Sequence, residues 1–183
     1  MARLLYANLE SDEARPLVDR IVAERGSVLL LYQMLLHSPP VASGWLTYLT
    51  AIRQLSTLPG ALRELVIMRV AILNGAPYEA DQHAPIARKE GITEAQLDEL
   101  DRWETSPLFD EDQRAALAYT DAMTRQIRVP QEVFDAVRAR MGERQVVELT
   151  ATIAAYNMVS RFLEALQVHT HDEGSGPDAR VGA

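Results

Sequence analysis

The sequence has no cysteine among its 183 residues. Without a thiol, the chain forms no disulfide, carries no thiolate nucleophile and offers no cysteine ligand to a metal. Thiol redox chemistry is excluded as well, whatever the compartment in which the protein works. This absence removes several large classes of enzyme before any residue that is present needs to be interpreted.

Basic residues are scarce: 18 Lys and Arg stand against 26 Asp and Glu, for a formal net charge of -8 at pH 7. A chain with this balance repels a phosphate backbone and lacks the basic surface that nucleic-acid binders carry. We therefore expect no nucleic-acid partner.

Long apolar runs are also missing. The longest, near residues 28 to 36, is far shorter than the roughly 20 residues that a membrane span needs, and the first 16 residues hold too short an apolar run for a signal peptide. We expect a cytoplasmic protein without membrane contact. A composition of 48% hydrophobic and 24% charged residues is typical of a globular protein, and the length suits one domain.

No segment alternates between apolar and polar residues with the period of a strand, and apolar residues recur at helical spacing almost throughout. We predict an all-α bundle of about nine helices and no sheet, within a single domain of residues 1–168. Pro39 and Pro40 are expected to end the second helix, and the polar residues 169–183 are predicted to be a disordered tail. The predicted helical segments are 11–26, 27–40, 41–55, 59–75, 77–90, 93–103, 106–127, 130–142 and 143–168.

Residues 59–75 are apolar on nearly every side, which predicts a buried helix that contains Glu64. A buried carboxylate needs a hydrogen bond, a proton or a wet cavity. The next helix places Glu79 and His83 four residues apart on one face. Because the connection between the two helices is short, we expect Glu64 and His83 to interact directly or through one water. Pro85 predicts a kink beside the imidazole, which could open room for a ligand.

Each of these residues also has a purely structural interpretation. Glu64 could pair with Arg69 or Arg53, as buried acids often do. His83 could be satisfied by one hydrogen bond inside the core. Glu79 suits the first turn of a helix because the helix dipole favours an acid there.

The segment LRELVIMRVAILNGAPYEADQHAPIARKEGITEAQLDEL, residues 62–100, resembles the core motif of the carboxymuconolactone decarboxylase family, which shares its all-helical fold with the alkylhydroperoxidase D-like proteins. Glu64 falls on the family's glutamate and His83 on its histidine. Tyr78 and Glu79 match the YE pair of one branch. Small residues further along also match, at Ala87 and Gly91. The resemblance covers roughly residues 28 to 168, with the core motif at about 47–130.

The sequence departs from the peroxidase branch of this family at two positions. That branch has two cysteines, seven and four residues before the histidine, where this chain has Ala76 and Glu79. Its mechanism needs a thiolate and a resolving cysteine, so this chain is not a thiol peroxidase.

The decarboxylase branch implies a cofactor-free lyase or isomerase that acts on a small unsaturated lactone or conjugated carbonyl compound. In this interpretation His83 is the proton donor or shuttle, Glu64 fixes its tautomer and charge, and Glu79 is a second acid-base group or excludes anionic ligands. Because two acids lie at the site, a neutral lactone or enone suits it at least as well as a carboxylate substrate. Three tyrosines are candidates for substrate contacts: Tyr78, as a donor to a developing oxyanion, Tyr119 and Tyr156.

Two other functions stay open at this stage. The same scaffold could catalyse a dehydration, a cyclisation or a cofactor-free oxidation, or the chain could be a non-catalytic oligomer that binds a small molecule. His169, His171 and Asp172 could bind a metal weakly, but they lie in the polar tail and we predict no metal site. The resemblance implies a trimer or hexamer, and apolar residues around the last helix are expected at its interface: Val146, Val147, Ile153, Val159 and Phe162.

Overall fold

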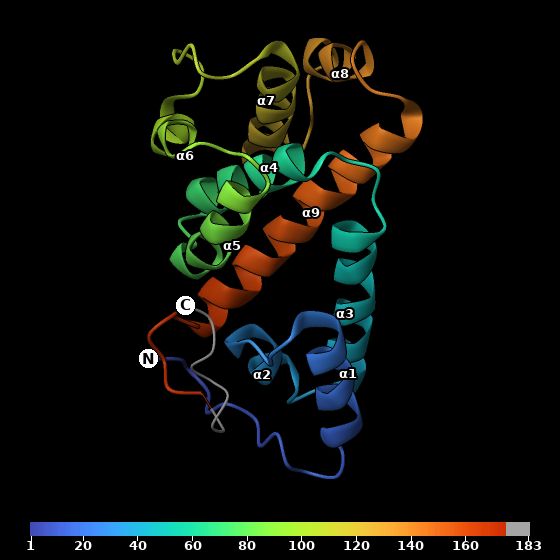
Figure 1. Cartoon of the computed structure of the whole chain (residues 1–183), viewed down its shortest axis with the longest axis vertical. Helices are drawn as coiled ribbons and strands as arrows, with labels where there is room; N and C mark the ends of the chain where they lie inside the picture. The colour runs from blue at the N-terminus through green and yellow to red at the C-terminus, as the bar shows by residue number, and fades with distance from the viewer. Residues whose placement is uncertain (175–183) are drawn as a thin grey trace. The chain divides into compact units, whose positions relative to one another are not determined.

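The computed structural model describes residues 1–174, which form nine α-helices, one short 3₁₀ helix and no strand (Figure 1). The prediction of an all-α fold is confirmed. The described residues divide into two compact units, Met1–Leu55 with the residues from Leu163 onward, and Ser56–Phe162. The elements are α1 (Arg15–Arg25), α2 (Leu30–Leu35), α3 (Pro39–Gln54), α4 (Gly60–Asn74), α5 (Pro77–Lys89), α6 (Glu94–Glu99), η1 (Leu100–Arg102), α7 (Glu111–Gln126), α8 (Gln131–Arg138) and α9 (Glu143–Leu166).

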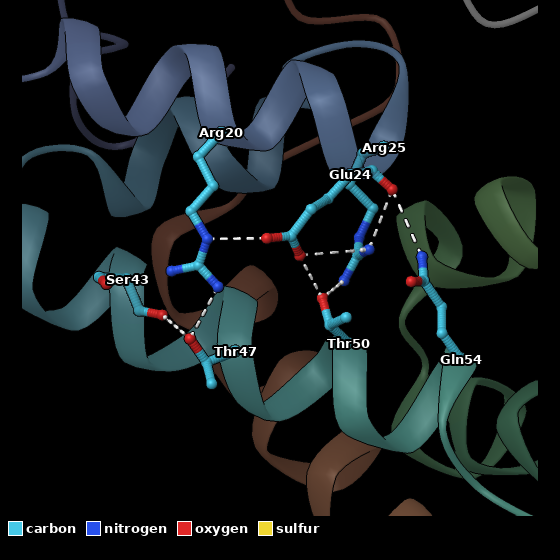
Figure 2. A network of polar contacts seen from close by, with 7 residues as sticks. All are labelled: Arg20, Glu24, Arg25, Ser43, Thr47, Thr50 and Gln54. Atoms are coloured by element: carbon cyan, nitrogen blue, oxygen red, sulfur yellow. Dashed lines mark hydrogen bonds and ion pairs between the residues drawn. The ribbon is translucent and has the colours of Figure 1, made fainter.

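The first unit packs α3 against α1 and α2. Apolar side chains such as Ile21, Ala42 and Leu46 are fully buried there. Polar side chains join the same helices, as Figure 2 shows: the Glu24 carboxylate accepts hydrogen bonds from Arg20 Nε at 2.7 Å and Thr50 Oγ1 at 2.6 Å. Helices α1 and α3 are thus joined by apolar packing and by a hydrogen-bond network around the Glu24 carboxylate.

Pro39 and Pro40 begin α3, whereas the sequence pattern predicted that they end the preceding helix. That prediction is wrong. α2 stops at Leu35, and proline suits the first turn of a helix because the backbone N–H that it lacks has no helical acceptor there. The two prolines therefore mark the start of α3 and not the end of α2.

The C-terminal residues 169–172 of the predicted tail are hydrogen bonded in the structure. The Asp172 carboxylate accepts hydrogen bonds from Tyr6 Oη at 2.8 Å and from the His169 backbone N–H at 3.1 Å. The rest of that prediction, over residues 175 to 183, lies outside the described residues.

The second unit is built around α4, which packs against α5, α7 and η1. Leu65, Val66 and Ile67 of this helix are fully buried, as its apolar sequence predicts. Arg69 is also buried, and its guanidinium donates two hydrogen bonds of 2.7 Å to the Asp121 carboxylate on α7. A third donor, Nη1, bonds the backbone carbonyl of Leu100 at 3.0 Å, so one side chain ties together α4, η1 and α7.

Local sequence signals set the ends of these helices. Thr93 and Gln96 form the predicted capping box at the start of α6. Gly75 ends α4 with a left-handed φ of 60°, a conformation that glycine adopts without steric cost, and the chain then enters α5 two residues later. Among the helices of residues 1–174, none combines the length and the apolar character needed to cross a bilayer.

Candidate acid-base site

The candidate site lies within the second unit, where α4, α5 and α9 each contribute side chains. Glu64 comes from the second turn of α4, Glu79 and His83 from α5, and Tyr156 from α9. All four are buried: Glu64 is 0% exposed, Glu79 and His83 are 4% exposed, and Tyr156 is 1% exposed. A titratable cluster with so little contact with water is expensive to build unless its charges are paired.

His83 lies between two carboxylates. Its Nδ1 is 2.6 Å from Glu64 Oε2, a hydrogen bond, and its Nε2 is 3.2 Å from Glu79 Oε1, an ion-pair distance. The predicted proximity of Glu64 and His83 on consecutive helices is therefore confirmed. Glu79 reaches the imidazole because the two residues are four apart on α5 and share one face.

This geometry limits where the protons can be. A neutral imidazole has one N–H donor and one lone pair, so it can face only one ionised carboxylate favourably. With a carboxylate at each nitrogen, the ring is either an imidazolium that donates on both sides, or one carboxyl group holds the proton. In both cases the cluster of Glu64, His83 and Glu79 binds at least one proton more than two carboxylates beside a neutral histidine would.

The charges around His83 favour the imidazolium. Burial lowers the pKa of His83, but hydrogen bonds to Glu64 and Glu79 and the charges of both carboxylates raise it further than burial lowers it. The net result is a pKa above the ordinary value of 6.5. The site therefore keeps its proton to a higher pH than an ordinary histidine would, in a place from which water is nearly excluded.

Glu64 has a second cationic partner in Arg63. Arg63 Nε donates to Glu64 Oε1 over 3.2 Å, while His83 occupies the other oxygen, Oε2. Of the pairings considered from the sequence, the one with Arg69 is not the arrangement seen, since Arg69 binds Asp121. Sequence reasoning missed Arg63 because neighbouring side chains on a helix seldom face each other, so helical spacing gives no signal for such a pair.

The three predicted tyrosines lie in different surroundings. Tyr156 packs edge-on against the His83 ring, with ring centroids 5.0 Å apart and an interplanar angle of 89°. Tyr78 precedes Glu79 on α5 and is 3% exposed. The Tyr119 hydroxyl pairs with Thr150 Oγ1 at 3.0 Å, on α7 and α9. Tyr156 thus contacts the imidazole, and the substrate-binding roles of all three tyrosines stay predictions.

Two further expectations concern the surroundings of the site. Pro85 lies inside α5 and is exposed, and the helix continues past it to Lys89. Across residues 1–174, no group of three or more His, Asp or Glu side chains is arranged to hold a metal ion. His169, His171 and Asp172 therefore do not form a metal-binding group in this structure.

The family model of the carboxymuconolactone decarboxylase family matches residues 39–122, a range that contains Glu64, Glu79 and His83. Among curated proteins, the uncharacterized protein YdfG of Bacillus subtilis is 32% identical over 113 residues, which cover 61% of this chain and 77% of that protein. The uncharacterized protein YnjA of Escherichia coli is 32% identical over 130 residues, covering 68% of this chain and 66% of that protein.

Solved structures show the same fold. A protein of unknown function from Agrobacterium tumefaciens is 26% identical, with a TM-score of 0.70 over 75% of this chain and 94% of that chain. The debrominase Bmp8, in a cysteine-to-alanine variant bound to 2,3,4-tribromopyrrole, has a TM-score of 0.78 over 92% of both chains at 21% identity. At that identity the likeness to Bmp8 shows the fold alone.

Proposed function

Because this chain belongs to the carboxymuconolactone decarboxylase family, we propose that it is a cofactor-free lyase or isomerase that moves a proton on a small unsaturated lactone or other conjugated carbonyl compound. The single observation that supports this function is the buried imidazole of His83, held between the carboxylates of Glu64 and Glu79 at 2.6 and 3.2 Å. Such a cluster can accept a proton from carbon and return it without a metal or an organic cofactor.

The two carboxylates have different roles in this proposal. Both oxygens of Glu64 are engaged, one by Arg63 and one by His83, so Glu64 fixes the ring and its charge. Glu79 lies on the Nε2 side, and the proton exchanged with substrate passes through Nε2 or through Glu79 itself. In a decarboxylation, the C–C bond to the carboxylate would break and release CO₂, the electron pair of that bond would move into the conjugated carbonyl group, and His83 Nε2 or a protonated Glu79 would give its proton to carbon.

The charge of the cluster favours a neutral substrate. With Arg63 and His83 positive and Glu64 and Glu79 negative, the four side chains sum to zero, and Glu79 is the carboxylate beside Nε2 of the imidazole. An anionic substrate placed there meets a carboxylate at close range in a medium of low dielectric. A lactone, enone or similar neutral carbonyl compound avoids this repulsion.

The proposed size of the substrate draws on Bmp8, a protein of the same fold. A Bmp8 variant that lacks one cysteine binds 2,3,4-tribromopyrrole, a small flat ring. Tyr156, edge-on to His83, offers an aromatic surface of the kind that such a ring contacts. The absence of cysteine removes the thiol chemistry of the peroxidase branch, so the acid-base groups are what the site can offer.

A screen for proton transfer tests this function. Unsaturated lactones and conjugated keto acids and esters are incubated with the protein in deuterated water, and NMR detects both turnover and exchange of substrate C–H for deuterium. We expect His83→Gln and Glu79→Gln to lower the rate roughly a hundred- to ten-thousand-fold with the fold retained. His37→Gln, at an exposed histidine, is the matched control and should keep full activity.

A structural pair would behave differently in the same assays. Breaking it would lower the melting temperature, because a buried charge left without its partner costs about 3 to 5 kcal/mol. If any activity then survived in proportion to the folded protein, the cluster would be structural and the proposal would be wrong.

We also propose a homo-oligomer, in which the outer face of α9 meets a second copy of the chain. Of the residues named from the sequence, Val146, Ile153 and Val159 are buried within the chain at 7%, 0% and 1% exposure, so they do not form this face. Val147 and Met158 are exposed at 66% and 37%. Light scattering on a Val147→Glu, Met158→Glu double variant should give the 20.4 kDa monomer and on the wild type a larger mass. A monomeric wild type at micromolar concentration would refute the assembly.

A further inference from the structure

Five charged groups of alternating sign follow one another from the surface of the second unit to its buried site. Glu90 Oε1 lies 3.8 Å from Arg63 Nη2, and Arg63 Nε lies 3.2 Å from Glu64 Oε1. Glu64 then bonds His83 at 2.6 Å, and His83 faces Glu79 at 3.2 Å. Exposure of the side chains falls over the first three groups, from 38% for Glu90 and 12% for Arg63 to 0% for Glu64, and stays low at His83 and Glu79. The catalytic proposal uses the last three groups, counts Arg63 only as a positive charge bonded to Glu64, and gives Glu90 no role.

Arg63 bears on where the proton of the Glu64–His83 pair resides. In a dry site, a carboxylate hydrogen bonded to an imidazolium competes with the neutral pair, in which the carboxyl group has taken the proton. A guanidinium that donates to the second oxygen of Glu64 stabilises only the ionised carboxylate. Arg63 thereby keeps the proton on His83 Nδ1, so the ring stays positively charged and its Nε2 proton, which faces Glu79, is more acidic than that of a neutral imidazole.

Glu90 holds Arg63 in place, and a glycine makes this possible. Glu90 follows α5 directly, and its carboxylate lies against the backbone of Gly60 at the start of α4. A Cβ on residue 60 would overlap Oε2 of Glu90. Any larger residue at this position would therefore move the carboxylate away from its place beside Arg63.

We propose that Arg63 is a positioning residue that holds Glu64 ionised and so keeps the shared proton on His83, and that Glu90, seated over Gly60, holds Arg63 for this task. This inference rests on the proposed acid-base function, because it concerns the same cluster. The charged and titratable groups that face His83 are Glu64 of α4, Glu79 of α5 and, edge-on, Tyr156 of α9.

NMR of protein labelled with ¹⁵N in histidine tests the role of Arg63 directly. The chain has 4 histidines, and the spectrum of His83→Gln assigns the signals of His83. We expect both ring nitrogens of His83 in the imidazolium range at neutral pH. In Arg63→Met the Nδ1 signal should move toward the neutral range as the proton passes to Glu64, and Arg63→Lys, which keeps the charge, should restore most of the wild-type shift.

Arg88→Met is the matched control for the loss of one positive charge. Arg88 lies on the same helix as His83, but its side chain pairs with the exposed Glu94 at 2.6 Å. We expect this variant to leave the His83 signals unchanged. If Arg63→Met also leaves them unchanged, or if Arg88→Met moves them equally, Arg63 does not position the proton and the inference is wrong.

Gly60→Ala tests the same role without removing a charge. Alanine favours the helix, and only the flexible carboxylate of Glu90 has to move, so the fold should be retained. We expect the His83 Nδ1 signal to move in the same direction as in Arg63→Met, by a smaller amount. Gly44→Ala is the control, since Gly44 also lies in a helix and has open space where the Cβ would stand. Equal spectra for the two alanine variants would remove Glu90 from the inference.

The NMR signals and the turnover screen can fail separately. If the screen finds no proton transfer but Arg63→Met still moves the His83 signal, the positioning role stands and the proposed reaction falls. If the wild type is active and the activity depends on His83, but the His83 Nδ1 signal is the same in Arg63→Met as in the wild type, the proposed reaction stands and the positioning role of Arg63 is wrong.

Discussion

Raising the pH should destabilise the protein through His83. The pKa of this histidine is above 6.5 in the folded chain, because the hydrogen bonds and charges of Glu64 and Glu79 outweigh the opposing effect of burial. In the unfolded chain a histidine titrates near 6.5. Between these two values the folded state binds a proton that the unfolded state has lost, so the free energy of unfolding falls as the pH rises. Below about 6.5 the stabilisation is fully present.

The size of the effect follows from proton counting. One proton difference changes the free energy of unfolding by at most about 1.4 kcal/mol for each pH unit. For a chain of this length, 1 kcal/mol corresponds to roughly 2 to 4 °C in melting temperature. The wild type should therefore lose up to about 3 to 6 °C per pH unit from this site, beginning near pH 6.5 and ending at the folded pKa of His83.

Melting temperatures measured from about pH 6 to about pH 9 on the wild type and on His83→Gln isolate this contribution, since the other titrating groups are common to both. His37→Gln serves as the control, because His37 is exposed and its Nε2 contacts a backbone carbonyl, that of Leu5, and not a carboxylate. We expect the wild-type and control curves to fall together and the His83→Gln curve to be flatter. Parallel curves for all three proteins would show that His83 binds no extra proton in the folded state, and the imidazolium would have to be abandoned.

Three further predictions concern stability and chemistry. Arg69→Met should lower the free energy of unfolding in urea by about 3 to 5 kcal/mol, because it leaves the Asp121 carboxylate without its bidentate partner; a loss below that of an exposed control such as Arg102→Met would contradict this. Ile127→Gly should raise the free energy of unfolding by about 1 kcal/mol, because glycine adopts a positive φ without the strain that a β-branched residue meets. Ile127 has a φ of 66° in a turn in which the Arg128 N–H donates to the Gln126 carbonyl at 2.7 Å, and its side chain is 84% exposed, so little packing is lost. Peroxide consumption coupled to a dithiol should not exceed that of heat-killed protein, since the sequence has no cysteine; activity abolished by His83→Ala would refute this.

The helices could be predicted from the sequence because their signals are local. Apolar spacing, the capping box of Thr93 and Gln96, and the glycine stop at Gly75 each depend on residues within one or two turns. Pro39 shows the limit of such signals, since proline both follows one helix and begins another. The division into two units depends on contacts between distant residues, which no local pattern encodes.

The contact between Glu64 and His83 could be predicted from the sequence, whereas the contact between Arg63 and Glu90 could not. Glu64 and His83 follow from an acid in an apolar helix and a short connection at Gly75, and the structure brings them to 2.6 Å. Glu90 could not be found this way, because its contact with Arg63 depends on how the end of α5 meets the start of α4. Pairs of this kind are set by packing between helices and leave no periodic signal in the sequence.

In the proposed function, the residue at position 79 decides which chemistry the site can perform. In the resemblance to the peroxidase branch, a thiol stands four residues before the histidine, where an imidazole can activate it as a nucleophile. Here Glu79 stands there, 3.2 Å from the same ring. A carboxylate there can exchange protons with the imidazole and cannot take part in thiol redox chemistry. In the proposed function Glu79, together with Ala76 in place of the other cysteine, therefore replaces thiol redox chemistry by proton transfer, while Glu64 and His83 keep their positions. In the same proposal Glu79 adds a negative charge beside Nε2, so the residue that would act as a second acid-base group would also disfavour anionic substrates.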